Sequence, residues 1–594
     1  MNAPAFYHLR ASRRQWWLVI ATGALTLLCG SIGVWQYEHA HSAREIQPLS
    51  GVLSSLYHAL QMLVLHTPYF EEGSNLWIEL GRWLGAFTLI ATTGMLLWKR
   101  LAHEFRLFRM AGWQGHYVVC GLGQKGHAIV RSIRQREPQA LIAVVDPLED
   151  NPLAGECCAL GACYACGDAR DAVARARARM AQAREVIIIT PDDETNVGIA
   201  LGISAFCAER GLKGPLCQIQ LSDIHLREIC QKIVGPDAQP GATLHFFDVY
   251  DDEARRVLCE LPLDGHGIKA GEPDKVHVVI LGLGRMGRSV ALRAARMGHF
   301  ANRQRLRISV IDRHAERQRE SLLFHYPALK SGEICQLDFH QAEAESATAR
   351  SLIEQWAAEQ DTRLHVFLCL DENSRAAQVA LRLQQALSGR ENLNLLVRIK
   401  SRTSLQAILE MVADRRPRLA AFGRVEDACT EQAFRHEHNE ALARAMHEQF
   451  VANREADSVR KPASEATLLE WDNLPEDVRE SNRQQADHID IKLRAIGCES
   501  APLNNLRPEV TTFTEPEIEL LAELEHQRWI SERRLAGWRY GTPSNKAKRV
   551  SEYLVPWNEL DGSIQKYDRQ SVMSIPALLK LARPPMKAVR KTKA

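Results

Sequence analysis

The stretch from His116 to Asp146, HYVVCGLGQKGHAIVRSIRQREPQALIAVVD, decides the fold of this chain. A short apolar run ends in the glycine turn Gly121-Leu122-Gly123-Gln124-Lys125-Gly126. A helical pattern follows, and a second apolar run closes at Asp146. Strand, glycine turn, helix and acid-tipped strand stand in the order of a dinucleotide-binding unit.

Each conspicuous residue of this stretch has a physical reason to bind a nucleotide. The first glycine allows a tight turn, the second lets a phosphate approach the backbone, and the third lets the helix pack on the sheet. The free N–H groups and the dipole at the helix start favour an anion. An acid at the end of the second strand lies where a ribose hydroxyl would bind. We therefore predict a nucleotide site at Gly121, Gly123, Gly126 and Asp146.

Length and composition limit the class of protein. A chain of 594 residues is expected to form several domains. Its net charge of +2 gives no general attraction to nucleic acid, so no nucleic-acid partner is expected. The 14 cysteines are scattered, which indicates a reducing compartment. Cys163 and Cys166 form a C-x-x-C without a second pair at zinc spacing, which favours buried thiols over a metal site.

Two apolar segments near the N-terminus predict membrane spans. Trp16 to Trp35 carries no charge and has the length of one bilayer crossing. Trp83 to Trp98 is the second segment, and Lys99, Arg100, Arg106 and Arg109 follow it. The positive-inside rule then places both chain termini in the cytoplasm. We expect a multi-pass protein of a bacterial inner membrane.

The loop between these segments contains a third apolar stretch, Leu53 to Leu65, which is too short to span and is expected to be a re-entrant helix. Span, re-entrant helix, loop and span resemble the pore module of two-span potassium channels over residues 15–100. We assign residues 1–110 to a pore-like module on this resemblance.

The expected filter departs from that family. Potassium filters are TVGYG-type strands, whereas this chain has Leu65, His66, Thr67, Pro68, Tyr69 and Phe70 and no glycine until Gly73. The resemblance therefore leaves three alternatives for the pore: weak selectivity, another ion, or no conduction. A two-helix anchor with an extracytoplasmic hairpin is a fourth reading of the same residues.

Further strands alternate with helices after the opening stretch, which predicts a doubly wound parallel sheet. The turn Gly167-Asp168-Ala169 and the segment PDDETN at Pro191 to Asn196 lie at expected strand ends. With the glycine turn and Asp146, these residues resemble the RCK (TrkA-N) regulatory domain of potassium channels and transporters, over Gly115 to Val234. We place the first such domain at residues 111–245 and add Asp168 to its ligand site.

The opening pattern recurs about 160 residues later. Its equivalents are Gly282, Gly284, Gly287 and Asp312, so we expect a second RCK-like domain at residues 274–430 after a crossover linker at 246–273. The resemblance implies a homotetramer whose paired domains form a gating ring, with NAD(H) or an adenine nucleotide as cofactor. The glycine turns could also be purely structural. Because neither copy shows a catalytic constellation, we expect no enzyme.

The C-terminal region follows a helical linker at residues 431–470. The motifs His526-x-x-Trp529, Gly537-Trp538-x-Tyr540-Gly541 and Leu554-Val555-Pro556-Trp557 resemble the RyR domain, the repeat of ryanodine receptors. We place this mainly helical domain at residues 471–582 and a basic, disordered tail at 583–594. Cations accompany the aromatic residues at Arg528, Arg533, Arg534, Lys548 and Arg549.

Aromatic faces beside guanidinium groups can bind a base and an anion. The predicted ligand pocket consists of His526, Trp529, Arg533, Trp538, Tyr540, Lys548, Trp557 and Tyr567. The tryptophans could instead form the core of the domain. The order of modules predicts a ligand-gated, tetrameric ion channel that senses a small cytosolic molecule. The alternatives are a non-conducting membrane-anchored nucleotide sensor or scaffold and a regulatory subunit of a cation transporter.

Overall fold

The structure is a computed structural model that describes residues 13–41, 48–66, 74–223, 226–227, 229–230, 241–400, 404–411, 418–424, 437–455 and 468–591. The chain forms two compact units. One contains residues 1–122 and 139–186, and the other contains residues 123–138 and 187–594.

Three helices form the N-terminal module: α1 (Arg13–His41), α2 (Pro48–Met62) and α3 (Leu76–Met110). Glycines let these helices approach closely. A Cβ atom on Gly33 would lie 2.6 Å from the backbone nitrogen of Ile78, and one on Gly85 would lie 2.4 Å from the carbonyl oxygen of Met62. Small residues at helix contacts are typical of membrane helices, where close backbone approach replaces hydrophobic burial.

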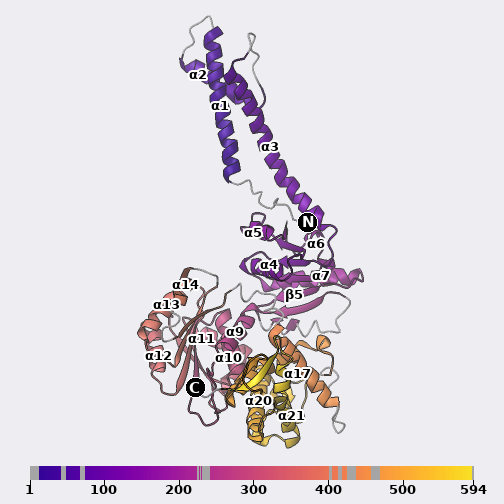
Figure 1. Cartoon of the computed structure of the whole chain (residues 1–594), viewed down its shortest axis with the longest axis vertical. Coiled ribbons are helices and arrows are strands. Elements are labelled where there is room, and N and C mark those ends of the chain that lie inside the picture. The colour runs from indigo at the N-terminus through magenta and orange to yellow at the C-terminus, as the bar shows by residue number, and fades with distance from the viewer. Residues whose placement is uncertain are drawn as a thin grey trace. The chain divides into compact units, whose positions relative to one another are not determined.

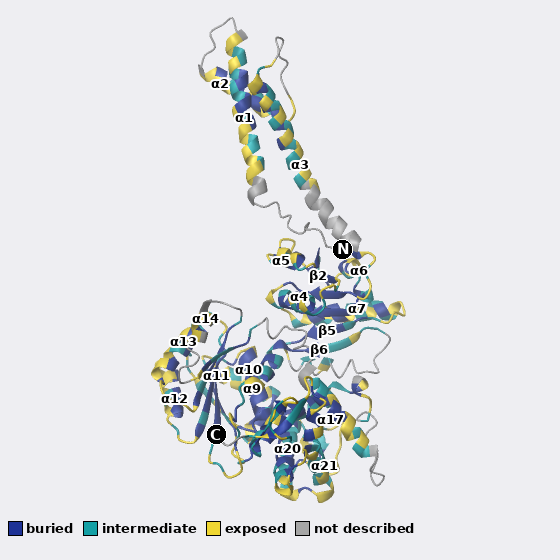
Figure 2. Cartoon of the chain, in the orientation of Figure 1, coloured by how far each residue is buried: buried dark blue, intermediate teal, exposed yellow. Residues whose placement is uncertain are grey.

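Figure 2 shows exposed stretches along α1 and α3. Among the exposed residues of these helices are the large apolar Trp17, Trp83 and Ile90. Among the described residues, the stretch Trp17–Ala40 is a helix long and apolar enough to cross a membrane. Helix α3 includes the second predicted span, and the predicted re-entrant segment 53–65 is helical as far as Met62. The predicted filter residues Thr67, Pro68, Tyr69 and Phe70 lie outside the described residues.

The first sheet, in which β5 is labelled in Figure 1, has the strand order β3-β2-β1-β4-β5-β6. Its strands are β1 (Tyr117–Cys120), β2 (Ile142–Asp146), β3 (Cys163–Cys166), β4 (Glu185–Ile188), β5 (Leu216–Gln220) and β6 (Thr243–Phe247). The helices between them are α4 (Gln124–Arg136), α5 (Ala154–Ala159), α6 (Ala172–Arg177) and α7 (Asp193–Glu209). The domain boundary predicted at residue 245 lies within strand β6, so the sheet extends past it.

Helix α9 (Val249–Glu260) leads to the second sheet, whose order is β12-β11-β10-β7-β8-β9. All five neighbouring pairs in it are parallel. Its strands are β7 (Lys275–Leu281), β8 (Arg307–Asp312), β9 (Gln336–Gln341), β10 (Thr362–Leu368), β11 (Leu393–Arg398) and β12 (Arg418–Phe422). Its helices are α10 (Arg285–Met297), α11 (Ala315–His325), α12 (Ala347–Ala357), α13 (Asn373–Ala386) and α14 (Ser404–Met411).

Read from the third strand of each copy, both sheets have the order 3-2-1-4-5-6 of a doubly wound fold. The central strands β7 and β10 of the second sheet are buried on both faces. Their near-continuous apolar sequences follow from this burial, because helices cover both faces of a parallel sheet. The predicted Rossmann-like fold of both copies is confirmed.

The C-terminal region is mainly helical. It contains α17 (Glu437–Glu455), α18 (Glu476–Asp487), α19 (Ile489–Ala495), α20 (Glu515–Leu535), α21 (Gly562–Met573) and α22 (Ile575–Leu579), with the short strands β13 (Cys498–Pro502), β14 (Arg539–Tyr540), β15 (Val550–Ser551) and β16 (Met586–Arg590). The prediction of a disordered tail is wrong, because β16 pairs antiparallel with β13. Ala588 and Val589 of β16 are buried, and this apolar burial offsets the cost of ordering the strand.

Candidate ligand-binding sites

The first glycine turn has the conformation that its residues predict. Gly121 has a φ of +100°, which favours glycine because it has no Cβ atom. Gly123 stands at the N-cap of α4, and a Cβ atom on it would meet nothing within 4 Å. The space beside the helix N-terminus is therefore open at the residue that a phosphate would approach, and the turn fits the phosphate end of NAD(H) or an adenine nucleotide.

Asp146 already binds the turn that it follows. Its carboxylate accepts hydrogen bonds from the Leu122 N–H at 2.7 Å, the Leu148 N–H at 3.1 Å and the Asn151 amide at 3.2 Å. The side chain of Asn151 also donates to the carbonyl oxygen of Leu122 at 2.9 Å. Asp146 thus fixes the shape of the turn, and a ribose hydroxyl would have to share its oxygens. The sequence did not single out Asn151 as a site residue. Its position five residues after Asp146 is the signal that could have indicated it.

The second turn repeats these contacts. Asp312 accepts from the Leu283 N–H at 2.8 Å and from the His314 N–H at 2.8 Å. Gly282 has a φ of +91°. A Cβ atom on Gly287 would lie 2.2 Å from the carbonyl oxygen of Gly282, so helix α10 can pack here only with glycine at the third position. Gly284 has nothing within 4 Å of its Cβ position, like Gly123. The two turns are structural equivalents.

The carboxylate of Asp168 is bound by a residue close in sequence, Arg170. Its carboxylate accepts from the backbone N–H of Arg170 at 2.9 Å and from the guanidinium of Arg170 at 2.7 Å. The hydrogen bond from the Arg170 side chain lowers the pKa of Asp168. In this structure, Asp168 shapes the turn after β3.

Tyr250 of α9 lies between two cations that are far apart in sequence. The ammonium of Lys125, from the first glycine turn, lies 4.7 Å from the centre of its ring, and the guanidinium of Arg398, from the end of β11, lies 5.5 Å from it. Sequence reasoning did not identify this arrangement, because a tyrosine at a helix start carries no pattern of its own.

Part of the predicted pocket in the C-terminal region is assembled around His526. Its ring stacks on Trp529 with a centroid distance of 5.8 Å and lies 5.7 Å from the ring of Trp557. One ring nitrogen is 2.8 Å from the carbonyl oxygen of Val555, and the other is 3.4 Å from the carboxylate of Asp568. These contacts hold the imidazole in one orientation.

Arg533 extends this aromatic cluster. Its guanidinium lies 5.7 Å from the ring centre of Trp529 and 5.3 Å from that of Trp538. We call His526, Trp529, Arg533, Trp538 and Trp557 the aromatic cluster. It offers faces for stacking and one cation, and such a set can bind a base and an anion.

Three residues of the predicted ligand pocket are not part of the aromatic cluster. Tyr540 is 62% exposed on β14. Lys548 is exposed, and its backbone N–H donates to the side-chain oxygen of Asn545 at 3.0 Å. Tyr567 accepts a hydrogen bond from Arg454 of α17 at 3.1 Å. Arg528, which the sequence places beside the aromatic residues, is buried and paired with Glu525 and Glu532. A ligand therefore cannot reach Arg528 without breaking these pairs.

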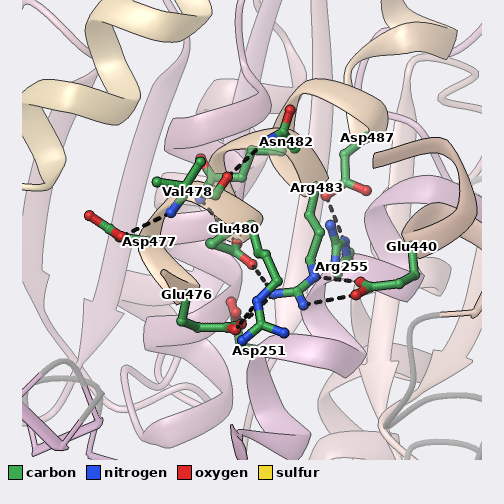
Figure 3. A network of polar contacts seen from close by, with 12 residues as sticks. Asp251, Arg255, Glu440, Glu476, Asp477, Val478, Glu480, Asn482, Arg483 and Asp487 are labelled. Atoms are coloured by element: carbon green, nitrogen blue, oxygen red, sulfur yellow. Dashed lines mark hydrogen bonds and ion pairs between the residues drawn. The ribbon is translucent and has the colours of Figure 1, made fainter. Parts of the chain in front are cut away.

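A buried network of charges joins the second doubly wound domain to the C-terminal region (Figure 3). Arg293 of α10 binds Asp251 of α9 at 2.5 Å and lies 3.5 Å from Asp487 of α18. Arg255 of α9 binds Asp487 at 2.6 Å. Arg293 and Asp487 are each 1% exposed, so their charges are compensated almost entirely by each other and by their protein neighbours.

The same network continues to α17. Arg483 donates to Glu440 at 2.6 Å and to Glu476 at 2.5 Å (Figure 3). Another charge pair joins the same two regions: Arg494 of α19 donates two hydrogen bonds of 2.8 Å to Asp264, which is buried. Burial raises the pKa of Asp248, which precedes α9, to about 6. Because α10 begins at the second glycine turn, the network connects the helix of that turn with α17 and α18 of the C-terminal region.

Two family models match parts of the chain, one in the first doubly wound domain and one in the C-terminal region. Residues 117–210 match the TrkA-N domain, and residues 499–582 match the RyR domain. No curated protein matches the chain.

Among solved structures, GsuK bound to ADP is similar at 15% identity and a TM-score of 0.37, over 71% of this chain and 99% of GsuK. A dipicolinate synthase chain from Bacillus halodurans is similar at 14% identity and a TM-score of 0.16, over 48% of this chain and 81% of that protein. At these TM-scores, neither likeness bears on arrangement or function. The chain thus carries a TrkA-N domain, followed by a second doubly wound domain and by an RyR domain.

Proposed function

We propose that this protein is a ligand-gated, tetrameric ion channel of the potassium-channel superfamily, or a membrane regulator built on the same plan. The observation that carries the proposal is the order of its parts: apolar helices α1 and α3, a TrkA-N domain with an open glycine turn, a second copy, and an RyR domain. The proposal places both termini in the cytoplasm of a bacterial cell and the helices in its inner membrane.

The proposed ligand is a nucleotide or a molecule derived from one. NAD(H) or an adenine nucleotide would bind with its phosphates at Gly123 or Gly284, where the Cβ positions are open. The aromatic cluster would bind a base by stacking. Ligand binding can shift a channel only by binding its open and closed states with different affinity. The role is binding and gating, and we propose no catalytic step.

The test is ion passage through the purified full chain in liposomes. Potassium flux is measured without ligand and with NAD+, NADH, ADP and AMP in turn. We expect at least one of these nucleotides to change the flux. If no ion passes under any of them, the channel proposal fails.

A second candidate is a non-conducting, membrane-anchored sensor, which includes a regulatory subunit of a cation transporter. The observation that favours it is the sequence from Leu65 to Phe70, which lacks the glycines of a potassium filter. The oligomeric state of the detergent-solubilised protein separates the candidates. Four copies of the chain are expected for a channel, and another number favours the sensor.

A further inference from the structure

A cavity of about 200 Å³ lies between the second doubly wound domain and the RyR domain, inside the second compact unit. One wall is a face of α20 formed by Gln527, Ile530, Ser531 and Arg534. These residues are spaced by three or four positions and therefore share one side of the helix. The opposite wall comes from the segments that precede β8 and β9.

The lining of this cavity is positively charged. It contains the guanidinium groups of Arg303, Arg305 and Arg534 and the carboxylate of Glu333. Arg534 forms an ion pair with Glu333. Arg305 donates to the carbonyl oxygen of Gly332 at 3.2 Å, and it has no carboxylate partner in the described part of the chain. The three arginines exceed the two carboxylates that pair with them, Glu333 and Glu523, by one positive charge.

Other lining groups suit a small organic anion. Phe300, Ile334 and Ile530 provide an apolar side. Ser531, a residue 5% exposed, adds a hydroxyl group to the lining. Guanidinium groups bind phosphate through paired hydrogen bonds.

We propose that this cavity binds a small phosphorylated molecule and that its occupation alters the contact between the two domains. Two ion pairs hold the domains together here: Arg534 with Glu333, and Arg303 with Glu523 at 2.7 Å. A phosphate among these arginines competes with both acids. The site is separate from the glycine turns and the aromatic cluster, so it goes beyond the proposed function and does not require ion passage.

The test is a calorimetric titration of the full chain in detergent with inorganic phosphate and with phenyl phosphate. It uses a Gly123→Asp/Gly284→Asp background, which places carboxylates at both glycine turns where the Cβ positions are open. We expect saturable binding at one site per chain, with phenyl phosphate tighter because its ring reaches the apolar side.

Arg305→Gln and Arg534→Gln are each expected to weaken binding about tenfold or more, because each removes a charge-assisted hydrogen-bond donor. Gln304→Glu adds a carboxylate at an exposed lining position and should weaken binding without loss of folding. The matched control is Arg350→Gln, an exposed arginine paired with Glu354 on α12. Absence of saturable binding, or equal affinity of the Arg305→Gln, Gln304→Glu and Arg350→Gln variants, would overturn the proposal.

Discussion

At the scale of single residues, His365 makes stability depend on pH. It lies in β10, where one ring nitrogen is 3.0 Å from the carbonyl oxygen of Leu263. Burial lowers the pKa of His365 from 6.5 to about 4. The unfolded chain therefore binds a proton at higher pH than the folded chain, and stability falls as pH decreases from 6.5 towards 4.

The expected loss from this histidine is at most about 3 kcal/mol. His365→Gln should flatten the dependence of the unfolding free energy on pH in this window. The measurement is chemical denaturation of the full chain at pH 6.5 and at pH 4.5. If the unfolding free energy changed equally with pH in the wild type and in His365→Gln, His365 would not titrate as its burial requires.

Gly287 and Gly284 differ in what a methyl group would meet, although both belong to one turn. Gly287→Ala should destabilise the protein by about 1–3 kcal/mol or more, because its Cβ atom would overlap the carbonyl oxygen of Gly282. Gly284→Ala should be tolerated, since its Cβ position is open. Thermal unfolding of the two variants compares them directly, and equal midpoints would contradict the observed packing.

Helices and strands show how far the sequence could predict the structure. The two glycine turns were predictable, because strand, turn, helix and acid are neighbours in sequence. Strand β16 was not predictable, because its partner β13 lies almost 90 residues earlier and its charges suggested a solvated tail. The ion pair of Arg293 and Asp487 could not be predicted from the sequence either, since no local pattern connects α10 with α18.

The buried network between α9, α10 and α18 makes a prediction at this scale. Arg293→Met should cost about 3–5 kcal/mol, because it leaves Asp251 and Asp487 buried without this cation. Arg350→Met, which removes an exposed pair with Glu354, should cost at most about 1 kcal/mol. Denaturation midpoints compare the variants, and similar losses for both would mean that the network does not hold the helices together.

The aromatic cluster makes a separate prediction about ligand binding. Trp538→Ala removes one of the two rings that Arg533 contacts, and the indole is only partly buried. A ligand that stacks there should bind about tenfold more weakly, with little change in stability. Calorimetric titration with ADP checks the affinity. A loss of stability at unchanged affinity would assign Trp538 to the core.

At the scale of the whole molecule, one chain combines an N-terminal module of apolar helices, two doubly wound domains and an RyR domain. The sequence predicted each part from local motifs. It could not place the RyR domain against the second doubly wound domain, because that contact depends on ion pairs such as Arg255 with Asp487 and Arg494 with Asp264. These pairs join α9 and the segment after it to α18 and α19 of the C-terminal region.

In the proposed channel, a nucleotide at the first glycine turn controls ion passage. The most direct test compares the nucleotide dependence of potassium flux in liposomes for the wild type, Gly123→Asp and the control Gly155→Asp. Both glycines have open Cβ positions, but only Gly123 stands where a phosphate would bind. We predict that Gly123→Asp abolishes the nucleotide response and that Gly155→Asp preserves it. An unchanged response in Gly123→Asp would contradict the claim.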